Sequence, residues 1–523
     1  MFDAMNLGQA LKCSVARQPG AEAVVDGDVR RDYSQWYDDI RRVAGGLAAR
    51  GLGAGDHFAV VMRNRYEMAA LAWASYMLGA IYTPLSWRGT AEEIGYCLRD
   101  AGAKFVAFDG AAEAAVLDAC AAEGIPAERT IGAVDAKADV ARFETLCDVQ
   151  AIEGPAAVDS EATCIMLYTS GTTGRPKGVP RSHRAELAAA MNHIAANQYP
   201  HGLSQLCVMP LFHTMGQRVM LTAAMLNGKL VLMPAYSAAG ALDLIESERI
   251  GSIFLVPTMF HDMLAQPDIG KRDLSCVVRA GFAGMPMAPS LVEKCVAHFA
   301  NAPFTNFYGS SEVYSFTSCL HQNLKPGCAG RANLNQEIRI VAADPDRRVG
   351  GDEVVAQGET GEIIASMDAL DAFDGYWKRP DADEKAIRDG WYFTGDLGAF
   401  DEDGELYVLG RVDDMIISGG ENIHPEEVED ALLRSGLAAG VVVIGLPDER
   451  MGQRVVAFVE PDKAGITAED LDAACRQGAL ADFKRPRGYA FVAAIPRSAS
   501  GKLLRRKLRD GDYTLLPEFK STI

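Results

Sequence analysis

The sequence has 523 residues, of which 49 % are hydrophobic and 23 % are charged, so the chain is long enough for several domains with large apolar cores. Its formal net charge of −19 argues against a nucleic-acid-binding surface. No window reaches the ~18 consecutive apolar residues of a membrane span, so we expect no membrane segment.

The N-terminal residues and the cysteines both bear on location. Residues 1–6 lack a basic stretch followed by an apolar run, so we expect no secretory signal. The 11 cysteines are scattered without a CxxC pair or a regular spacing. This pattern favours reduced thiols in a cytoplasmic protein over a disulfide framework or a zinc site.

The first two-thirds of the chain reads as parallel α/β units. Helix-like patterns alternate with short apolar runs, which suit buried parallel strands. The runs lie at 58–62, 105–108, 206–209, 230–233, 252–256 and 277–280. We therefore predict an α/β fold with parallel sheets in a large N-terminal domain.

The pattern changes at about residue 335. Short segments at 337–341, 362–365 and 406–409 are separated by Gly and Asp turns, which predicts a small antiparallel, barrel-like subdomain. A compact α+β unit follows, with a helix that starts at Pro425 and strands at 441–444 and 455–459. We place the boundary at 411–414, which gives domains of 1–412 and 413–523.

The most informative segment directly follows an apolar run at 164–167. Glycines let backbone N–H groups approach phosphate oxygens, hydroxyls donate hydrogen bonds and a lysine adds positive charge. The segment reads Tyr168-Thr169-Ser170-Gly171-Thr172-Thr173-Gly174-Arg175-Pro176-Lys177-Gly178. It is not the P-loop of kinases, because Gly178-Val179-Pro180 cannot continue a helix after the lysine. We predict a polyphosphate-binding loop.

Further motifs accompany this loop in a fixed order. They are Tyr308-Gly309-Ser310-Ser311-Glu312, Trp391-Tyr392-Phe393-Thr394-Gly395-Asp396, Gly410-Arg411-Val412-Asp413-Asp414, Ser418-Gly419-Gly420-Glu421-Asn422 and Pro496-Arg497-Ser498-Ala499-Ser500-Gly501-Lys502. Together they resemble the adenylate-forming enzymes, which include acyl-CoA ligases, luciferases and the adenylation domains of peptide synthetases. The segments 410–426 and 481–487 most resemble 4-chlorobenzoate–CoA ligase and other aryl-CoA ligases.

The resemblance implies a reaction in two steps. A carboxylate attacks the α-phosphate of ATP, pyrophosphate leaves, and the acyl-adenylate then passes its acyl group to CoA. For the first step it implies that Glu312, assisted by Thr169, binds Mg²⁺. The residues expected to bind ATP or AMP are Thr169, Ser170, Gly171, Thr172, Thr173, Gly174, Lys177, Tyr308, Ser311, Asp396 and Arg411.

The C-terminal motifs imply a catalytic lysine and a moving domain. Lys502 would bridge the attacking carboxylate and the α-phosphate, where negative charge accumulates. The small domain would rotate as a lid about Asp413 and exchange Lys502 for CoA. The residues expected to bind CoA are Arg88, Gly419, Gly420, Glu421, Phe483, Arg485 and Arg487. Met451 stands where a related ligase has an aromatic residue that clasps CoA.

The acid pocket is implied by the segment 210–215. His213 stands where amino-acid-activating relatives carry an Asp, so amino acids are not expected, because a buried ammonium needs such a partner. His213 is expected to gate the site and to be catalytic with Lys502 and Glu312. The pocket residues implied are His213, Thr214, Met215, Phe254, Ala283, Gly284, Phe307, Gly309, Tyr314 and Ser315.

This set is mostly aromatic and apolar, which favours a small aromatic, heteroaromatic or cyclic acid over a long alkyl chain. The alternatives are a medium-chain fatty acyl-CoA ligase and a stand-alone adenylation module that loads a carrier protein. The expected partners are the acid and CoA, with no nucleic acid and no membrane. A homodimer is compatible with the sequence. A lysine acetyltransferase and a deacetylase acting on Lys502 would regulate the first step.

Overall fold

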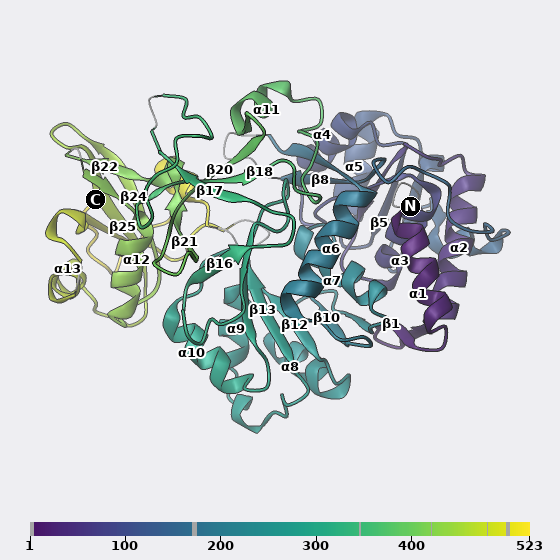
Figure 1. Cartoon of the computed structure of the whole chain (residues 1–523), viewed down its shortest axis with the longest axis horizontal. Helices are drawn as coiled ribbons and strands as arrows, with labels where there is room; N and C mark the ends of the chain where they lie inside the picture. Colours follow the sequence, from purple (N-terminus) through teal and green to yellow (C-terminus); the bar gives the residue numbers. More distant parts are fainter. Residues whose placement is uncertain (1–4, 170–174, 345–346, 420, 479, 498–502) are drawn as a thin grey trace. The chain divides into compact units, whose positions relative to one another are not determined.

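A computed structural model describes residues 5–169, 175–344, 347–419, 421–478, 480–497 and 503–523 (Figure 1). The chain forms two compact units: residues 1–338 with 365–392, and residues 339–364 with 393–523. The predicted boundary at 411–414 falls inside the second unit, so the division at 412/413 and the hinge at Asp413 stay predictions.

A seven-stranded sheet in the first unit has the order β7-β6-β5-β3-β4-β8-β9. All its neighbours are parallel except β8 and β9, which form an antiparallel pair. Its strands are β3 (His57–Val61), β4 (Ile81–Pro84), β5 (Phe105–Asp109), β6 (Thr130–Ala133), β7 (Ala141–Arg142), β8 (Thr163–Thr169) and β9 (Lys177–Ser182). The phosphate-loop motif therefore joins the last two strands.

A second group of strands in the first unit has the order β16-β15-β14-β13-β12-β10-β11-β1-β2. The centre is parallel, and β2, β15 and β16 pair antiparallel. The strands are β1 (Glu22–Asp26), β2 (Val29–Asp32), β10 (Gln205–Cys207), β11 (Leu230–Leu232), β12 (Ser252–Leu255), β13 (Arg279–Ala283), β14 (Phe304–Tyr308), β15 (Thr317–Cys319) and β16 (Cys328–Ala332). The apolar runs predicted as strands overlap strands here. The run at 206–209 extends two residues past β10, which ends at Cys207, and the run at 277–280 begins two residues before β13, because the chain turns at Val277.

The helices of the first unit lie between these strands along the chain, except the first, which precedes β1, and the last, which follows β16. They are α1 (Leu7–Arg17), α2 (Tyr33–Ala49), α3 (Tyr66–Leu78), α4 (Ala91–Ala101), α5 (Glu113–Glu123), α6 (His183–Asn197), α7 (Thr214–Met225), α8 (Ala238–Ser247), α9 (Pro257–Leu264), α10 (Pro289–His298) and α11 (Pro380–Ala386). In the described part of the chain, no helix is long and apolar enough to cross a membrane.

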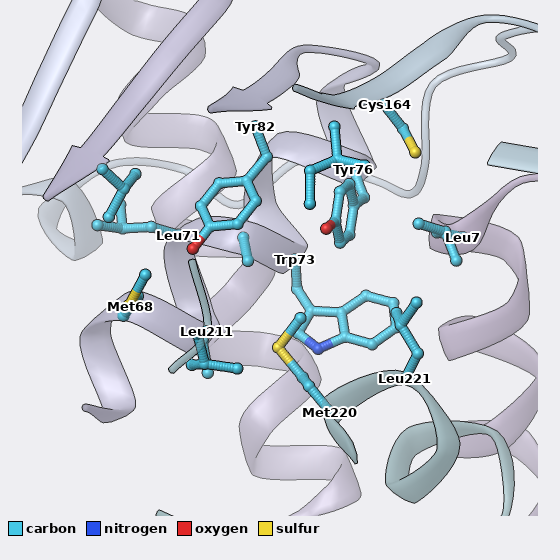
Figure 2. Close-up of a cluster of buried hydrophobic side chains, with 14 of the residues drawn as sticks. Leu7, Met68, Leu71, Trp73, Tyr76, Tyr82, Cys164, Leu211, Met220 and Leu221 are labelled. Atoms are coloured by element: carbon cyan, nitrogen blue, oxygen red, sulfur yellow. The ribbon is translucent and has the colours of Figure 1, made fainter. Parts of the chain in front are cut away.

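The core around α3 fixes the position of α7. Trp73 and Tyr76 of α3 are fully buried, and their rings meet edge to face at 5.7 Å. Figure 2 shows Met220 and Leu221 of α7 packed beside Trp73. Gln217 of the same helix accepts a hydrogen bond from the Tyr76 hydroxyl at 3.1 Å. Helix α7, which begins in the predicted acid-pocket segment, is thus anchored on one side by a rigid core.

The second unit contains two groups of strands. One has the order β17-β18-β20-β21 and the other β23-β22-β25-β24, with β26 parallel to β25. The strands are β17 (Ile338–Val341), β18 (Gly361–Ser366), β20 (Trp391–Phe400), β21 (Leu406–Arg411), β22 (Ile416–Ser418), β23 (Glu421–Ile423), β24 (Ala438–Asp448), β25 (Gly452–Pro461) and β26 (Gly488–Phe491). The short strand β19 (Ile387–Arg388), which pairs with β20, belongs to the first unit. Helices α12 (Pro425–Arg434), α13 (Ala468–Gln477) and α14 (Arg505–Arg509) complete the unit.

Candidate active site

The ends of the phosphate-loop motif are fixed by strands β8 and β9. Thr169 and Lys177 are opposite each other in this pair. Residues 170–174 lie outside the described residues, so their predicted role stays a prediction. Gly178 follows Lys177, and a Cβ there would lie 3.0 Å from Cβ of Trp377. The backbone N–H of Trp377 also donates to the Gly178 carbonyl at 2.9 Å. This close approach explains why the motif carries glycine at 178.

The predicted metal-binding residue, Glu312, lies in a closed turn after β14. The backbone N–H of Ser310 donates to the Val313 carbonyl at 3.0 Å, and the Ser310 hydroxyl accepts from the N–H groups of Glu312 and Val313. A Cβ on Gly309 would lie 2.0 Å from the Tyr314 carbonyl oxygen, so only glycine fits there. The turn therefore holds Glu312 through its own backbone.

Three groups from other parts of the first unit bind Glu312. Its carbonyl oxygen accepts from Arg181 Nη1 at 3.1 Å and from the N–H of Phe373 at 2.9 Å. Its carboxylate accepts from the Tyr376 hydroxyl at 2.7 Å. Glu312 is only 7 % exposed, so this carboxylate is held in one orientation rather than solvated freely.

Lys177 lies next to the same carboxylate. Its ammonium is 4.0 Å from the centre of the Tyr376 ring, a cation–π contact. Burial lowers the pKa of Lys177, and Glu312 opposes this shift. Lys177, Tyr376 and Glu312 thus form one polar group at the start of β9.

Arg181, near the other end of β9, is fully buried. Its Nε donates to Glu186 at 2.5 Å, and both side chains are fully buried. Its guanidinium also lies 3.5 Å from the centre of the Tyr314 ring, and a second arginine, Arg218, lies 4.9 Å from that centre. The predicted pocket residue Tyr314 is therefore packed against two guanidinium groups.

The segment 210–215 leads into α7, and its predicted role in the acid pocket stays a prediction. His213 is the N-cap of α7, and its Nδ1 accepts from the N–H of Met215 at 3.3 Å. That bond leaves the proton of the neutral ring on Nε2. A Cβ on Gly216 would lie 2.2 Å from the Pro210 carbonyl, so the chain passes very close to itself here. This packing sets the orientation of His213.

Two predicted pocket aromatics meet in the structure. Phe254 of β12 and Phe307 of β14 are 5.3 Å apart between ring centroids. A buried histidine that the sequence reasoning did not include, His193 of α6, stacks on Phe307 at 4.5 Å. Burial keeps the pKa of His193 well below its ordinary value, so this ring is neutral. The aromatic group is therefore apolar in character.

Not every predicted pocket residue joins this group. Ala283 follows Phe282 at the end of β13 and pairs with Phe307, whereas Gly284 is exposed, with φ +89°. Ser315 is buried and accepts from Arg218 Nη1 at 2.9 Å, so its hydroxyl is engaged by the protein.

In the second unit, Asp396 and Arg411 lie opposite each other on β20 and β21. Arg411 Nη1 donates to Asp396 Oδ1 at 2.8 Å and to the Thr394 carbonyl at 3.0 Å. The Thr394 hydroxyl accepts from the Asp396 N–H at 3.0 Å. Asp396 is thus oriented from two sides, which suits the carboxylate expected to accept from a ribose diol.

The predicted CoA-binding residues have different surroundings. Gly419 has φ +62°, and a Cβ there would lie 2.4 Å from the methyl group of Met451. Arg485 is tied to Asp472 and Asp482, whereas Phe483 is 44 % exposed. Glu421, Arg487 and, in the first unit, Arg88 are also on the surface. Gly420 and Lys502 lie outside the described residues.

The sequence matches the family described as AMP-binding enzyme over residues 11–377, and the AMP-binding enzyme C-terminal domain over residues 427–502. The first match alone covers more than half of the chain. The chain therefore belongs to the AMP-binding enzyme family, as the order of its motifs predicted.

Similar proteins include the long-chain-fatty-acid–CoA ligase FadD13 of Mycobacterium tuberculosis, 31 % identical, with 98 % of this chain and 100 % of FadD13 covered. The 4-chlorobenzoate–CoA ligase of an Arthrobacter species is 32 % identical, with 95 % of this chain and 93 % of the ligase covered. The structure of o-succinylbenzoate–CoA synthetase (MenE) from Bacillus subtilis with its acyl-adenylate intermediate has a TM-score of 0.84 at 28 % identity. The match covers 97 % of this chain and 99 % of the synthetase. The predicted adenylate-forming superfamily, the α/β fold class and the enzyme class, an AMP-forming acid–CoA ligase, are confirmed.

Proposed function

We propose that this enzyme activates a small aromatic, heteroaromatic or cyclic carboxylic acid with ATP and transfers it to CoA. The observation that carries the proposal is the held carboxylate of Glu312, bonded to Tyr376 beside the ammonium of Lys177. A fixed anion beside a buried cation is what a site for a metal-bound polyphosphate requires.

The first step uses groups from several parts of the chain. Lys177 and the loop at 169–174 bind the departing pyrophosphate, Ser311 contacts the α-phosphate, and Lys502 approaches the attacking carboxylate. Asp396 and Arg411 hold the ribose, and Tyr308 stacks on the adenine. The donors stabilise charge as it develops on the phosphate oxygens, without reorganising first.

The residues present fit Mg²⁺. One oxygen of the Glu312 carboxylate is held by Tyr376, and carboxylate and hydroxyl oxygens are the ligands this cation prefers. Glu312 and Thr169 would hold the ion. When bound, it would neutralise charge on the phosphates.

The second step requires CoA. The small C-terminal domain turns about Asp413, removes Lys502 and brings Gly419 and Gly420 to the pantetheine path. Arg88, Glu421, Phe483, Arg485 and Arg487 bind the rest of CoA. Because Met451 covers Gly419 where an aromatic residue is expected, we expect the affinity for CoA to differ from that of the related aryl-CoA ligases.

Substrate size is inferred from the pocket aromatics. Phe254 and Phe307 lie edge to face, with His193 stacked on Phe307, so this part of the first unit is filled with rings. Such a wall suits a flat or cyclic acid. A fatty acid is the second candidate, because the relative FadD13 is named as a long-chain-fatty-acid ligase.

The setting of the enzyme is also proposed. The 11 cysteines are free thiols, which supports a reducing, cytoplasmic location. A role in aromatic acid degradation follows only from the proposed ring-acid substrate. Acetylation of Lys502 would remove the charge needed in the first step, so an acetyltransferase and a deacetylase would regulate it. A homodimer is the quaternary structure we propose to test.

The test is AMP release from ATP with a panel of acids, with and without CoA. The panel holds benzoates, furoate, cyclohexanecarboxylate, cinnamates and C4–C12 fatty acids. We expect CoA-dependent release with one class of ring acid. Release with fatty acids alone would replace the ring-acid proposal, and release that is indifferent to CoA would indicate loading of a carrier protein.

A further inference from the structure

Arg218 is a buried cation on the helix that begins at the acid-pocket segment. It lies on α7, between Gln217 and Val219, and is 7 % exposed. The helix is anchored by its neighbours: Gln217 bonds Tyr76, and Met220 and Leu221 pack beside Trp73 (Figure 2). The backbone of Arg218 is therefore fixed, and its guanidinium cannot reach bulk water without disturbing the core.

The hydrogen bonds of this guanidinium are incomplete. Nη1 donates to the Ser315 hydroxyl at 2.9 Å and, at 3.4 Å, to the Ala189 carbonyl. Nε is buried and has no acceptor, and Nη2 makes no hydrogen bond to the described residues. Within that part of the chain, no carboxylate lies within ion-pair distance of Arg218, whereas Arg181 is paired with Glu186. Of five N–H donors, most are therefore left without a partner.

The surroundings of Arg218 are those predicted for the acid. Its guanidinium lies over the ring of Tyr314 and on the hydroxyl of Ser315, and both residues were expected to line the pocket. Its positive charge also contributes to keeping His193 neutral, and His193 stacks on the pocket residue Phe307. A buried donor left unpaired is costly, and a ligand that supplies an acceptor removes that cost.

We propose that Arg218 determines the substrate class: the acid carries a neutral oxygen acceptor, such as a hydroxyl, ether or carbonyl group, at a distance from its reacting carboxylate. This inference rests on the proposed ligase function. Nε and Nη2 of Arg218 would donate to that oxygen while Ser315 holds Nη1. A purely structural role for Arg218 does not explain why a charged side chain occurs in a helix segment followed by the apolar residues Val219, Met220 and Leu221.

The local charge balance favours a neutral acceptor over a second carboxylate. Arg181 and Arg218 are matched by two buried acids, Glu186 and Asp371. Burial raises the pKa of Asp371, and Arg181 and Arg218 oppose that shift, so the carboxylate already interacts with both cations. A dicarboxylic acid would add an uncompensated negative charge to this buried group, which is unfavourable. A hydroxyl, ether or carbonyl oxygen adds none.

The experiment compares matched acids in the wild-type enzyme and in Arg218→Met. Each set contains a parent acid, its hydroxy, methoxy or acetyl derivative, and the corresponding dicarboxylic acid. Sets are built on benzoate, cinnamate, cyclohexanecarboxylate and octanoate, so linear acids are tested too. The readout is kcat/KM for AMP release in the presence of CoA. In the wild-type enzyme we expect kcat/KM for the best acceptor-bearing acid to be at least tenfold higher than kcat/KM for its parent acid. In Arg218→Met we expect this ratio of kcat/KM values to approach one.

Two further variants separate specificity from folding. Arg218→Lys keeps a charge but loses the planar fork, and we expect an intermediate ratio. Arg279→Met is the matched control, because Arg279 also donates to backbone carbonyls, those of Asn197 and Gln198, yet contacts no predicted pocket residue. It should keep the wild-type ratio. Thermal unfolding of each variant shows whether it is folded. If Arg218→Met is not folded, the ratio measured for Arg218→Lys is used to test the role of Arg218.

Three results would overturn the inference while leaving the ligase function standing. These are a wild-type ratio near one, a ratio that survives in folded Arg218 variants, and a dicarboxylic acid as the best substrate. Absence of AMP release with every acid would instead overturn the ligase proposal, and this inference with it.

Discussion

Arg181 Nη1 donates to the backbone carbonyl of Glu312 at 3.1 Å, so strand β9 supports the residue predicted to bind the metal. The same strand begins with Lys177, the predicted phosphate-binding lysine. Residues four apart on a strand are on the same face. One rigid element thus positions two parts of the proposed adenylation site.

Replacing Arg181 should slow adenylation selectively. Arg181→Lys keeps the charge that balances Glu186 but cannot bond Glu186 and Glu312 together, and we expect kcat for adenylation to fall by about tenfold. Pyrophosphate-exchange and single-turnover assays measure this step. Thioester formation from supplied acyl-adenylate should be unchanged, and an equal loss in both half-reactions would contradict the positioning role. The double variant Arg181→Met with Glu186→Met removes both buried charges together and serves as the folding control.

Removing the Tyr376 hydroxyl should weaken metal binding. In Tyr376→Phe the Glu312 carboxylate loses its donor at 2.7 Å. Loss of such a partner typically costs about 10–100-fold in metal affinity or activity. A Mg²⁺ titration of adenylation should therefore shift to higher concentration. Tyr236→Phe, which loses a bond to the Met259 carbonyl, is the control. An unshifted titration in Tyr376→Phe would rule out Glu312 as a ligand oriented by Tyr376.

Asp396 should discriminate ATP from 2′-deoxy-ATP. Its carboxylate is oriented by Arg411 at 2.8 Å, and we expect it to accept from the ribose diol. Asp396→Asn should raise KM for ATP about tenfold, a loss within the range of a hydrogen bond to a charged group. It should also reduce the preference for ATP over the deoxy analogue. If both nucleotides respond equally to the substitution, the ribose contact is wrong. Asp462→Asn, at an exposed position, provides the control.

Lys502 should be needed for the first step alone. Lys502→Gln, which mimics acetylation, removes the charge beside the α-phosphate, and we expect adenylation to fall by ~10²–10³. Thioester formation from isolated acyl-adenylate should persist. Enzyme acetylated at Lys502 with undiminished adenylation would refute both the catalytic role and the proposed regulation.

Stability of the second unit should depend on Glu426. Burial raises the pKa of this carboxyl to about 7, against 4.5 for an ordinary Glu, while Arg505 opposes the shift. Between pH 4.5 and pH 7 the Glu426 carboxyl is protonated in the folded state but ionised in the unfolded state. Its contribution to the free energy of unfolding is therefore complete below pH 4.5 and is lost as the pH rises through 7. Glu426→Gln should remove this loss, which is about 3 kcal/mol at pH 8.

Thermal unfolding of the full chain from pH 4 to pH 8 measures this effect. The control is Glu427→Gln, because Glu427 is an exposed neighbour paired with Lys484. It should leave the pH dependence as in wild type. A Glu426 variant with the wild-type pH dependence would show that the carboxyl titrates normally.

The sequence was sufficient for the strands that form apolar runs, such as β3, β5, β11 and β12, because these depend on local pattern. The apolar run at 164–167 correctly predicted the strand before the phosphate-loop motif, and Pro180 correctly excluded a helix after Lys177. The strand that follows, β9, was not predicted. The order of the motifs identified the family.

The partners of Glu312 could not be found in the same way. Tyr376 is 64 residues from Glu312 along the chain, and only the tertiary fold brings them together. Arg218 did carry a signal, because it is the one charged residue of the mostly apolar helix α7, whereas Arg181 lies in a strand that also contains Lys177 and Ser182. A buried arginine needs acceptors, but the sequence does not show which distant carbonyls and hydroxyls supply them.

The closed turn from Gly309 to Tyr314 restricts how this enzyme can acquire new substrates. A Cβ at 309 would lie 2.0 Å from the Tyr314 carbonyl, and Ser310 and Val313 are bonded across the turn. An insertion or deletion here would displace Glu312, and if Glu312 is the proposed metal ligand we expect it to abolish turnover for every acid alike. Evolution and protein engineering are therefore confined to exchanging side chains on an unchanged loop length, and the rings and guanidinium packed behind the turn are the positions open to that exchange.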